Sequence, residues 1–308
     1  MKFTKMHGIG NDYIYFNCFE EKIKNPGELS IKLSDRHFGA GGDGIVLILP
    51  SDKADFRMRM FNADGSEGKM CGNASRCVGK YLYEKGLTKK TSIKLETLSG
   101  IKVLDLKVVN EKVVSVKVNM GKPIVEAKNI PVISDEEEVI NRELIINKEK
   151  YNITCLSMGN PHCVVFMDNI HNLDLEKIGP YFENNEIFPD RINTEFVEII
   201  NEKYIKMRVW ERGSGETLAC GTGACASVVA SVINGYCKRD SDIKVGLLGG
   251  ELIINYTSQG DVYMEGPAEF VYEGRIEDEK KVYFCNRWSC IRPWKRYNSS
   301  ILRKTFKK

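Results

Sequence analysis

Two of the ten cysteines stand directly before a stretch with the pattern of a helix, and each is followed by glycine. They are Cys71, in the segment MCGN, and Cys220, in the segment ACGTG. A helix N-terminus presents unpaired N–H groups and the positive end of the helix dipole, which lower the pKa of a nearby thiol from about 8.5 toward neutrality. The glycines leave the same N–H groups open to a carboxylate. The sequence therefore predicts two reactive thiols beside an anion site.

One thiol on each side of a carbon atom suits a two-base proton exchange. A thiolate removes a proton from the carbon while the opposite thiol delivers one to the other face, which inverts a stereocentre without a cofactor. Helix N-termini that hold the substrate carboxylate would stabilise the carbanion. No C-x-x-C pair is present, so we predict no zinc site. Six other cysteines are predicted to be buried apolar side chains, namely Cys18, Cys77, Cys155, Cys163, Cys225 and Cys237.

The two cysteines occupy equivalent places in an internal repeat, whose offset of 149 residues is the separation between Cys71 and Cys220. Matches at one offset indicate two related halves, each of which supplies one thiol. Three further matches share this offset: Met58-Arg59 with Met207-Arg208, Glu67 with Glu216, and Gly10-Asn11 with Gly159-Asn160.

One buried helix and several short strands in each half are predicted to position the thiols. The segment from Ala224 to Asn234 is apolar nearly all round, and its counterpart runs from Asn73 to about Lys85. Strand patterns rich in β-branched residues occur at 44–49, 113–118 and 251–256. We therefore expect an α+β fold of two pseudo-symmetric halves, each a mostly antiparallel sheet wrapped around a central helix, with the active site in the cleft between them.

Composition and charge exclude several other classes. The 308 residues contain no apolar run near the roughly 18 to 20 residues of a membrane span, so we expect no membrane association. No apolar stretch typical of a signal peptide follows the N-terminus, which predicts reduced thiols in the cytoplasm. From Lys280 to Lys308 there are ten Lys or Arg and no Asp or Glu. This tail carries +10, whereas the rest, with 35 basic and 42 acidic residues, carries −7.

Eight short motifs, spread over residues 1 to about 276, resemble those of the diaminopimelate epimerase family. They are HGIGNDY at 7–13, DRHFG at 35–39 continuing to Asp43-Gly44, FNADGSE at 61–67, CGN at 71–73 with Arg76-Cys77, GNPH at 159–162, NTEF at 193–196, WERG at 210–213, and ACGTG at 219–223. The resemblance covers nearly all of the chain outside the tail.

The resemblance implies a cofactor-independent epimerase that interconverts LL- and meso-2,6-diaminopimelate for lysine and peptidoglycan synthesis. Cys71 and Cys220 would be its acid and base, and Glu211 and His162 would assist. A diamino diacid needs both donors and acceptors, which asparagine supplies without net charge, and Arg212 can fork onto the distal carboxylate. The substrate-binding residues implied are Asn11, Asn62, Gly72, Asn73, Asn160, Asn193, Glu211, Arg212, Gly221 and Thr222.

The resemblance also implies an organisation of the chain. Residues 1–121 would form the first half, to which 267–276 return, and 122–266 the second, which leaves a basic tail at 277–308. Tyr272 matches a position that the family uses in its homodimer contact. Gly44 aligns with Asn193 across the repeat and is a departure, because many members carry a polar side chain there.

Three alternatives remain open from the residues alone. A proline or hydroxyproline racemase relative would share the two halves and the paired thiols, although a monocarboxylic substrate leaves Glu211, Arg212 and Asn193 without a partner. The segment from Gly39 to Gly44 fits G-x-G-x-x-G, but it precedes a strand, which disfavours dinucleotide binding. A nucleic-acid binder would rest wholly on the tail, whose basic residues alternate with Trp288, Trp294, Tyr297 and Phe306, and we expect none.

Overall fold

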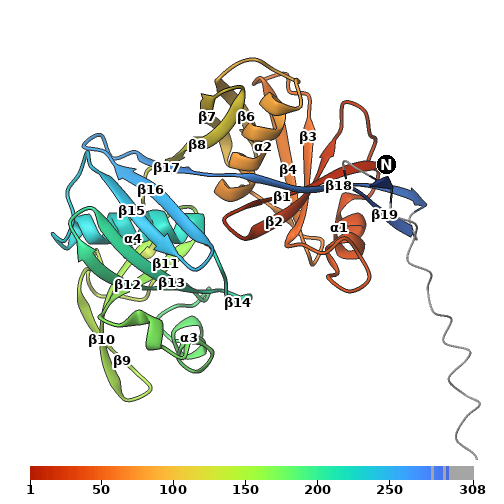
Figure 1. Ribbon diagram of the computed structural model, residues 1–308. Coiled ribbons are helices and arrows are strands. Elements are labelled where there is room, and N and C mark those ends of the chain that lie inside the picture. The colour runs from red at the N-terminus through yellow and green to blue at the C-terminus, as the bar shows by residue number, and fades with distance from the viewer. Residues whose placement is uncertain (279–280, 287–288, 291–308) are drawn as a thin grey trace, which may run out of the picture.

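The computed structural model describes residues 1–278, 281–286 and 289–290, and Figure 1 shows two halves that each enclose one long helix. The enclosed helices are α2 (Gly72–Glu84) and α4 (Gly221–Ile233). Both predicted buried helices are confirmed, although α4 begins three residues earlier than its apolar pattern. The predicted α+β class, with a mostly antiparallel sheet around each helix, is confirmed as well.

The strands of the first half surround α2. Neighbours pair antiparallel except for β2–β3 and β4–β6, which are parallel. Parallel neighbours need a crossover, and the crossovers here are α1 (Pro26–Ser34) and α2. The strands are β1 (Lys2–Gly8), β2 (Asn11–Asn17), β3 (Gly44–Leu49), β4 (Phe56–Asn62), β5 (Glu67–Gly68), β6 (Ser92–Thr97), β7 (Gly100–Val109) and β8 (Lys112–Gly121).

The second half repeats this plan around α4. Its parallel pairs are β11–β12 and β13–β15, and the crossovers are α3 (Leu175–Glu183), preceded by η2 (Ile170–Asn172), and α4. A short turn, η1 (Ala127–Asn129), precedes its first strand. The strands are β9 (Arg142–Ile146), β10 (Glu149–Ser157), β11 (Pro161–Phe166), β12 (Asn193–Asn201), β13 (Tyr204–Glu211), β14 (Gly215–Glu216), β15 (Asp242–Leu247), β16 (Gly250–Tyr256) and β17 (Val262–Gly266).

Two strand pairings join the halves. β17 pairs antiparallel with β8, and β18 (Glu269–Asp278) pairs antiparallel with β1. In Figure 1 these two strands follow one another from the second half into the first. The expected boundaries at residues 121 and 266 remain a prediction.

The repeat is visible in the strand register. Tyr13 lies opposite Gly44 in the parallel pair β2–β3, and the residues 149 positions later, His162 and Asn193, lie opposite each other in β11–β12. The one central helix expected in each half is confirmed, and α1 and α3 are further helices that were not predicted. Each is a nine-residue crossover that buries only a few side chains against the outside of its sheet, among them Leu33 and Phe182.

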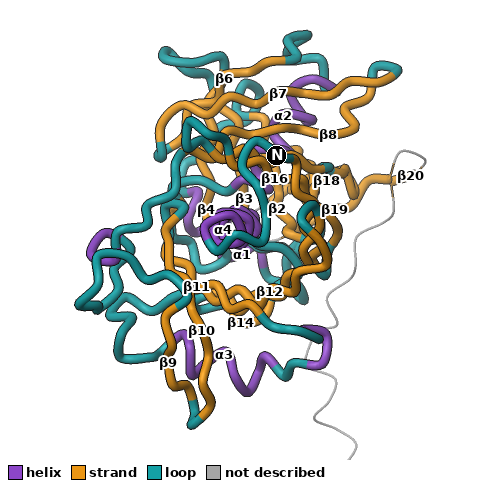
Figure 2. Tube along the Cα trace, turned by 90° about the vertical axis from the view of Figure 1, so that its left-hand side faces the viewer, coloured by secondary structure: helices purple, strands orange, loops and turns teal. Residues whose placement is uncertain are grey.

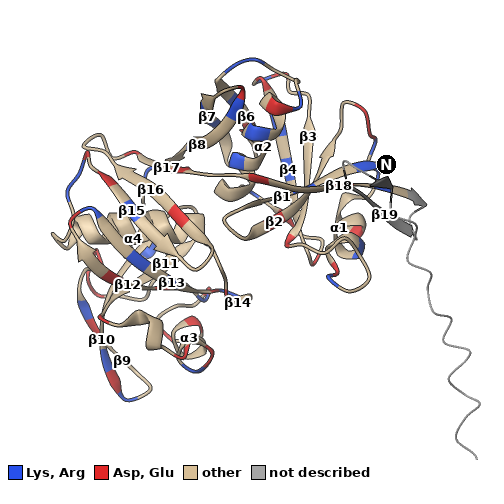
Figure 3. Cartoon of the chain, in the orientation of Figure 1, with Lys and Arg blue, Asp and Glu red and all other residues tan. Residues whose placement is uncertain are grey.

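The two central helices are both buried, but they differ in the charged residues that they carry. α4 contains no charged residue, and Figure 2 looks along its axis with strands on several sides. α2 carries charged residues, seen in Figure 3, yet Arg76 and Lys80 are buried there. The Lys80 ammonium donates to the Val113 carbonyl at 2.8 Å and pairs with Glu84 at 3.0 Å, so this buried charge is compensated.

The sheet continues past residue 276, where the tail was expected to begin. β18 extends to Asp278, and β19 (Lys281–Asn286) pairs with it before the short β20 (Ser289–Cys290). The aromatic residues on which the nucleic-acid alternative rests lie outside the described residues. Within the described part, no helix has the length and apolarity of a membrane span.

Candidate active site

Each of the two singled-out thiols caps a central helix. Cys71 is the N-cap of α2, and its Sγ accepts from Ala74 N at 3.5 Å. Cys220 is the N-cap of α4, and its Sγ accepts from Gly223 N at 3.3 Å. Both residues have extended backbones, as N-cap residues usually do. The structure therefore places one sulfur at each helix N-terminus.

The predicted direction of the thiol pKa values is wrong. Burial raises the pKa of Cys71 and raises that of Cys220 well above its ordinary value. The backbone N–H groups do act in the expected direction on both thiols, but burial outweighs them. The carboxylate of Glu211 raises both pKa values further, and Glu195 adds to the effect at Cys220. Arg76 acts in the opposite sense at Cys71.

The N-termini of α2 and α4 lie against each other across the junction of the two halves. The side-chain amide of Asn73, which is 2% exposed, donates to the Ala219 carbonyl at 3.4 Å. Met264 touches both helix starts: a Cβ added at Gly72 would lie 2.4 Å from its Cε, and one at Gly221 would lie 3.1 Å from its Sδ. The two glycines therefore permit the close approach that brings the thiol-bearing ends together.

Asn11, at the start of β2, connects the first thiol to a carboxylate. Its Oδ1 accepts from the Cys71 thiol at 3.4 Å, and its Nδ2 donates to Asp43 Oδ2 at 2.7 Å. The structure thus brings this predicted substrate-binding asparagine to the sulfur of the first half.

Asn160, its equivalent in the second half, is held by a buried histidine. The Nε2 atom of His162 lies 3.1 Å from Asn160 Oδ1, and its Nδ1 lies 2.7 Å from Glu195 Oε1. The side chains of His162 and Glu195 are both fully buried. Glu195 on β12, His162 on β11 and Asn160 just before β11 therefore form one series of hydrogen-bonded side chains.

Asn193 and Arg212 are brought together at the ends of β12 and β13. The buried Asn193 amide donates to the Pro161 carbonyl at 2.7 Å, and its Oδ1 accepts from Arg212 N at 3.0 Å. The Arg212 guanidinium donates to the Asp190 carbonyl at 2.8 Å. Both predicted residues therefore lie at one edge of the second half.

Glu211 reaches the second thiol. Its Oε1 accepts from Thr217 Oγ1 at 2.5 Å. Burial raises the pKa of this carboxyl, while hydrogen bonds with Thr217 and the Cys220 thiol act in the lowering direction. Thr222 Oγ1 also lies 3.5 Å from Cys220 Sγ. Glu211 and Thr222 therefore lie at the Cys220 sulfur, and Thr217 binds Glu211.

Two predicted residues make other contacts. The Asn62 amide donates to Ser66 Oγ at 3.0 Å within the turn that joins β4 to β5. Tyr272 packs on its own chain, where its hydroxyl donates to the Ala40 carbonyl at 2.7 Å. Gly44 has a φ of +156°, and a Cβ there would lie 2.0 Å from the Phe61 carbonyl oxygen. No side chain fits at Gly44 without a shift of the backbone.

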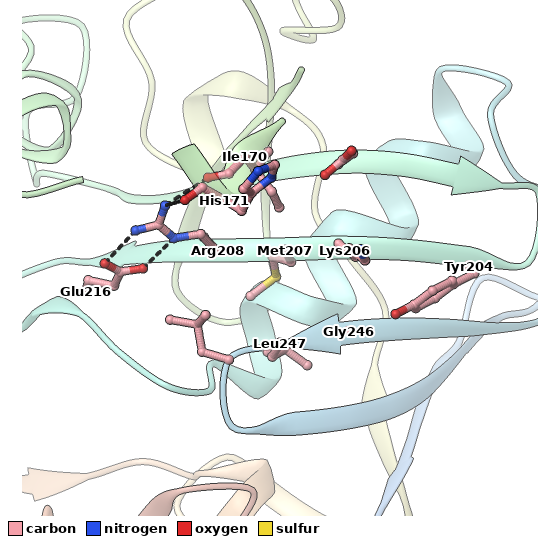
Figure 4. Close-up of a pocket in the computed structure, with 11 residues that line it drawn as sticks. Ile170, His171, Tyr204, Lys206, Met207, Arg208, Glu216, Gly246 and Leu247 are labelled. Atoms are coloured by element: carbon pink, nitrogen blue, oxygen red, sulfur yellow. Dashed lines mark hydrogen bonds and ion pairs between the residues drawn. The ribbon is translucent and has the colours of Figure 1, made fainter. Parts of the chain in front are cut away.

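A pocket of about 440 Å³ lies in the second half, and neither of the two thiols lines it (Figure 4). Arg208 crosses it, paired with Glu216 at 2.7 Å and donating to the carbonyl of Ile170 at 2.8 Å. Its lining includes none of the predicted site residues.

Sequence reasoning missed three polar residues of the site. Asp43 and Glu195 stand inside the quoted motifs, but neither is among the predicted site residues. Thr217 has no motif of its own. A charged residue within the otherwise uncharged strand stretch NTEFV is the one available signal for Glu195.

Comparison with solved structures finds the same fold in other proteins. A probable proline racemase from Agrobacterium radiobacter K84 superposes with a TM-score of 0.67 at 13% identity, over 89% of this chain and 92% of that one. A hydroxyproline epimerase from Agrobacterium vitis gives 0.64 at 14% identity, over 89% and 90%. At these identities the likeness shows the fold alone.

The family follows from closer relatives. A family model described as diaminopimelate epimerase matches residues 3–126 and 154–271. Diaminopimelate epimerases from Methanococcus maripaludis strain C5 and Acetivibrio thermocellus are each 58% identical over 278 residues. These alignments cover 90% of this chain and 100% and 99% of those proteins. The chain belongs to the diaminopimelate epimerase family, and the predicted resemblance is confirmed.

Proposed function

We propose that this protein interconverts LL- and meso-2,6-diaminopimelate by proton exchange at the α-carbon, with Cys71 acting on one face of that carbon and Cys220 on the other. The observation that carries the proposal is the pair of thiols that cap matched helices whose N-termini meet at the junction of the halves. Membership of the diaminopimelate epimerase family supports the substrate. The reaction feeds lysine and peptidoglycan synthesis.

The chemistry requires one thiolate and one thiol. The thiolate of one cysteine takes the α-proton from one face of the substrate carbon, and the thiol of the other gives its proton to the opposite face. The substrate carboxylate lies against the N–H groups at the starts of α2 and α4, those of Gly72, Asn73, Gly221 and Thr222, which stabilise the developing charge. Glu211, beside Cys220, accepts from a substrate ammonium.

The other end of the substrate meets a donor and acceptor set without excess charge. Arg212 supplies a guanidinium for the distal carboxylate, and Asn193 holds the backbone of that residue. Asn11 and Asn160 face the junction, each with one amide atom already tied to the protein. Asn62 completes the set from the first half. A monocarboxylic substrate such as proline would leave Arg212 unmatched.

The test is an epimerase assay in deuterium oxide with LL-diaminopimelate, and with proline as the control substrate. We expect deuterium at the inverted carbon, and a loss of at least about 10³-fold in kcat for Cys71→Ala and for Cys220→Ala. The matched controls are Cys77→Ala and Cys225→Ala, which remove the next buried thiol of each helix and should retain activity. Full activity in either of the first two variants, or turnover of proline, contradicts the proposal.

The pH dependence follows from the direction of the thiol pKa values. Burial raises both, so at pH 7 the pair holds two protons and the required thiolate is scarce. We expect kcat/KM to increase from pH 7 to beyond about pH 8.5, the ordinary cysteine pKa, and to decrease only where both thiols ionise. A profile that declines steadily above pH 7 would contradict these directions.

We further infer a homodimer and a cytoplasmic location. Support for the dimer is the match of Tyr272 to the position that the family uses in its homodimer contact. Support for the location is that eight cysteines of the described residues are free, as expected in a reducing compartment. Sedimentation of Tyr272→Ala against the unmodified protein tests the first inference.

A further inference from the structure

The two equivalent asparagines, Asn11 and Asn160, are fixed with their amides in opposite directions. In the first half the NH₂ group of Asn11 is bound by Asp43, and its carbonyl oxygen faces the Cys71 thiol. In the second half the carbonyl oxygen of Asn160 is bound by His162, and its NH₂ group has no partner among the described residues. One half therefore offers an acceptor and the other a donor.

Asp43 determines the direction in the first half. Its carboxylate accepts from three groups: Asn11 Nδ2 at 2.7 Å, Asp12 N at 3.0 Å and Arg36 Nη2 at 2.9 Å. An ionised carboxylate only accepts hydrogen bonds, so the amide atom that faces it must be the nitrogen. Arg36 also pairs with Asp12 at 2.8 Å, and Lys5 pairs with Asp12 at 2.5 Å. This network holds the carboxylate in place.

The pair of His162 and Glu195 determines the direction in the second half. Both side chains are fully buried, and His162 Nδ1 lies 2.7 Å from Glu195 Oε1, which fixes the ring. The other ring nitrogen, Nε2, lies 3.1 Å from Asn160 Oδ1. Because an amide oxygen only accepts, Nε2 donates to it, and the NH₂ group of Asn160 points away from the ring.

Neither half carries the group that the other half uses. At the offset of 149 residues, Asp43 aligns with Ile192 and Glu195 aligns with Val46. The sequence therefore specifies opposite orientations for the two amides, although both residues are asparagine.

We propose that Asp43 and Glu195 are positioning residues that give the equivalent asparagines opposite hydrogen-bonding polarity. Asn11 then offers its carbonyl oxygen to the Cys71 thiol and to an ammonium group, and Asn160 offers its NH₂ group to a carboxylate. An amino acid carries one group of each kind, so this asymmetry fixes the direction in which it lies across the junction. The ligand class rests on the proposed function, whereas the polarity does not.

The first experiment measures alkylation of Cys71 by iodoacetamide in the free protein, by peptide mass mapping at several pH values. A carbonyl acceptor favours the thiol form, whereas an amide freed from Asp43 can turn its NH₂ group to the sulfur and favour the thiolate. We expect Asp43→Ala to speed alkylation of Cys71 about fivefold at pH 7.5. Asp43→Asn, which keeps an acceptor, should restore the original rate, and the rate at Cys220 should not change.

The control that isolates the asparagine is the same substitution in an Asn11→Ala background. If Asp43 acts through Asn11, then Asp43→Ala has no further effect there. An equal acceleration in that background would mean that the charge of Asp43 acts directly on Cys71, and the proposal fails. Fast alkylation of the buried Cys77 would reveal an unfolded variant, in which case Asp43→Leu replaces Asp43→Ala. No substrate is present, so the result is independent of the proposed function.

The second experiment measures the kinetics of Glu195→Val and Glu195→Gln with diaminopimelate. The side-chain amide introduced by Glu195→Gln can still hydrogen-bond to His162 Nδ1 and leave the hydrogen on Nε2, whereas the apolar side chain introduced by Glu195→Val cannot. We expect KM to increase about tenfold in Glu195→Val, with Glu195→Gln close to the original value, and no added effect in an Asn160→Ala background. Equal KM values for both variants at Glu195 would overturn this half of the proposal.

Discussion

The two halves share their scaffold and differ in the groups around it. Each has a cysteine that caps a buried helix, and each has an arginine that pairs with a glutamate across a turn: Arg59 with Glu67 at 2.6 Å, and Arg208 with Glu216 at 2.7 Å. These pairs lie 149 residues apart, as the cysteines do. The repeat has therefore kept the ion pair that closes the turn beside each site.

The polar groups around the thiols are not shared. Where the second half has His162 and Glu211, the first half has Tyr13 and Asn62 at the same offset. The carboxylates that raise the pKa of Cys220, those of Glu211 and Glu195, both lie in the second half, so Cys220 has acidic surroundings. A duplicated scaffold can thus hold two like nucleophiles while its variable positions distinguish the two faces of one substrate.

The largest effect is expected at Glu211 and its equivalent Asn62, where one half has a carboxylate and the other a neutral amide. Glu211→Gln removes the charge beside Cys220, and we expect kcat to fall about 10²-fold because the ammonium acceptor is weakened. The charge of Glu211 raises the pKa of both thiols, so its removal lowers both and should shift the pH profile to lower pH. Rates measured from pH 6 to pH 10 test both statements.

Asn62→Ala is the matched variant in the first half. The Asn62 amide is bound to Ser66, so we expect less than a tenfold change, confined to KM, and no shift of the pH profile. If Asn62→Ala and Glu211→Gln changed kcat equally, the halves would contribute alike and the contrast drawn from their contacts would be wrong.

The next effect concerns Gly44 and Asn193, which are equivalent in register. Gly44→Asn would put a Cβ 2.0 Å from the Phe61 carbonyl at a φ of +156°, and we expect a loss of about 3 kcal/mol in the free energy of unfolding. Asn193→Gly instead removes two hydrogen bonds and should lose about 2 kcal/mol. Urea unfolding measures both, and a stable Gly44→Asn protein would show that the backbone can shift there.

Local patterns predicted the parts of this molecule that depend on neighbours in sequence. The apolar stretch around Ala224 and the Asn234-Gly235 stop define α4, and the repeat places Cys71 and Cys220 at equivalent caps. α1 and α3 escaped prediction because each is only nine residues long and buries few side chains. Their helical form depends on the sheet that they cover.

The predictions that failed, or were not made, concern properties that depend on contacts between distant segments. The thiol pKa values rise because the two halves bury the helix ends, which no pattern around Cys71 or Cys220 reveals. Asp43 reaches Asn11, and Glu195 reaches His162, across parallel strands joined by long crossovers. Pairing of residues more than 30 positions apart requires the register of β2–β3 and β11–β12, which only the fold supplies.

The smallest effects are expected at the two equivalent arginines, Arg208 and Arg59. They show whether the ion pair that both halves share contributes equally to the stability of each half. Arg208 is 14% exposed and donates to the carbonyls of Ile170 and Leu173 as well as to Glu216, as Figure 4 shows in part. Arg208→Met removes hydrogen bonds to two partly buried carbonyls and to Glu216, so we expect a loss of about 2 kcal/mol in the free energy of unfolding.

Arg59→Met is the control for the same ion pair in the first half. Arg59 is 33% exposed and binds Glu67 alone, apart from its position over the Phe61 ring at 5.0 Å. We expect a loss below about 1 kcal/mol, because a solvated pair contributes little. In about 1 M salt the effect of Arg59→Met should nearly vanish, whereas that of Arg208→Met should persist, since screening reaches exposed charges first. Equal losses in the free energy of unfolding at both positions would mean that the carbonyl contacts of Arg208 add no stability. The structural difference between the two ion pairs would then have no energetic consequence.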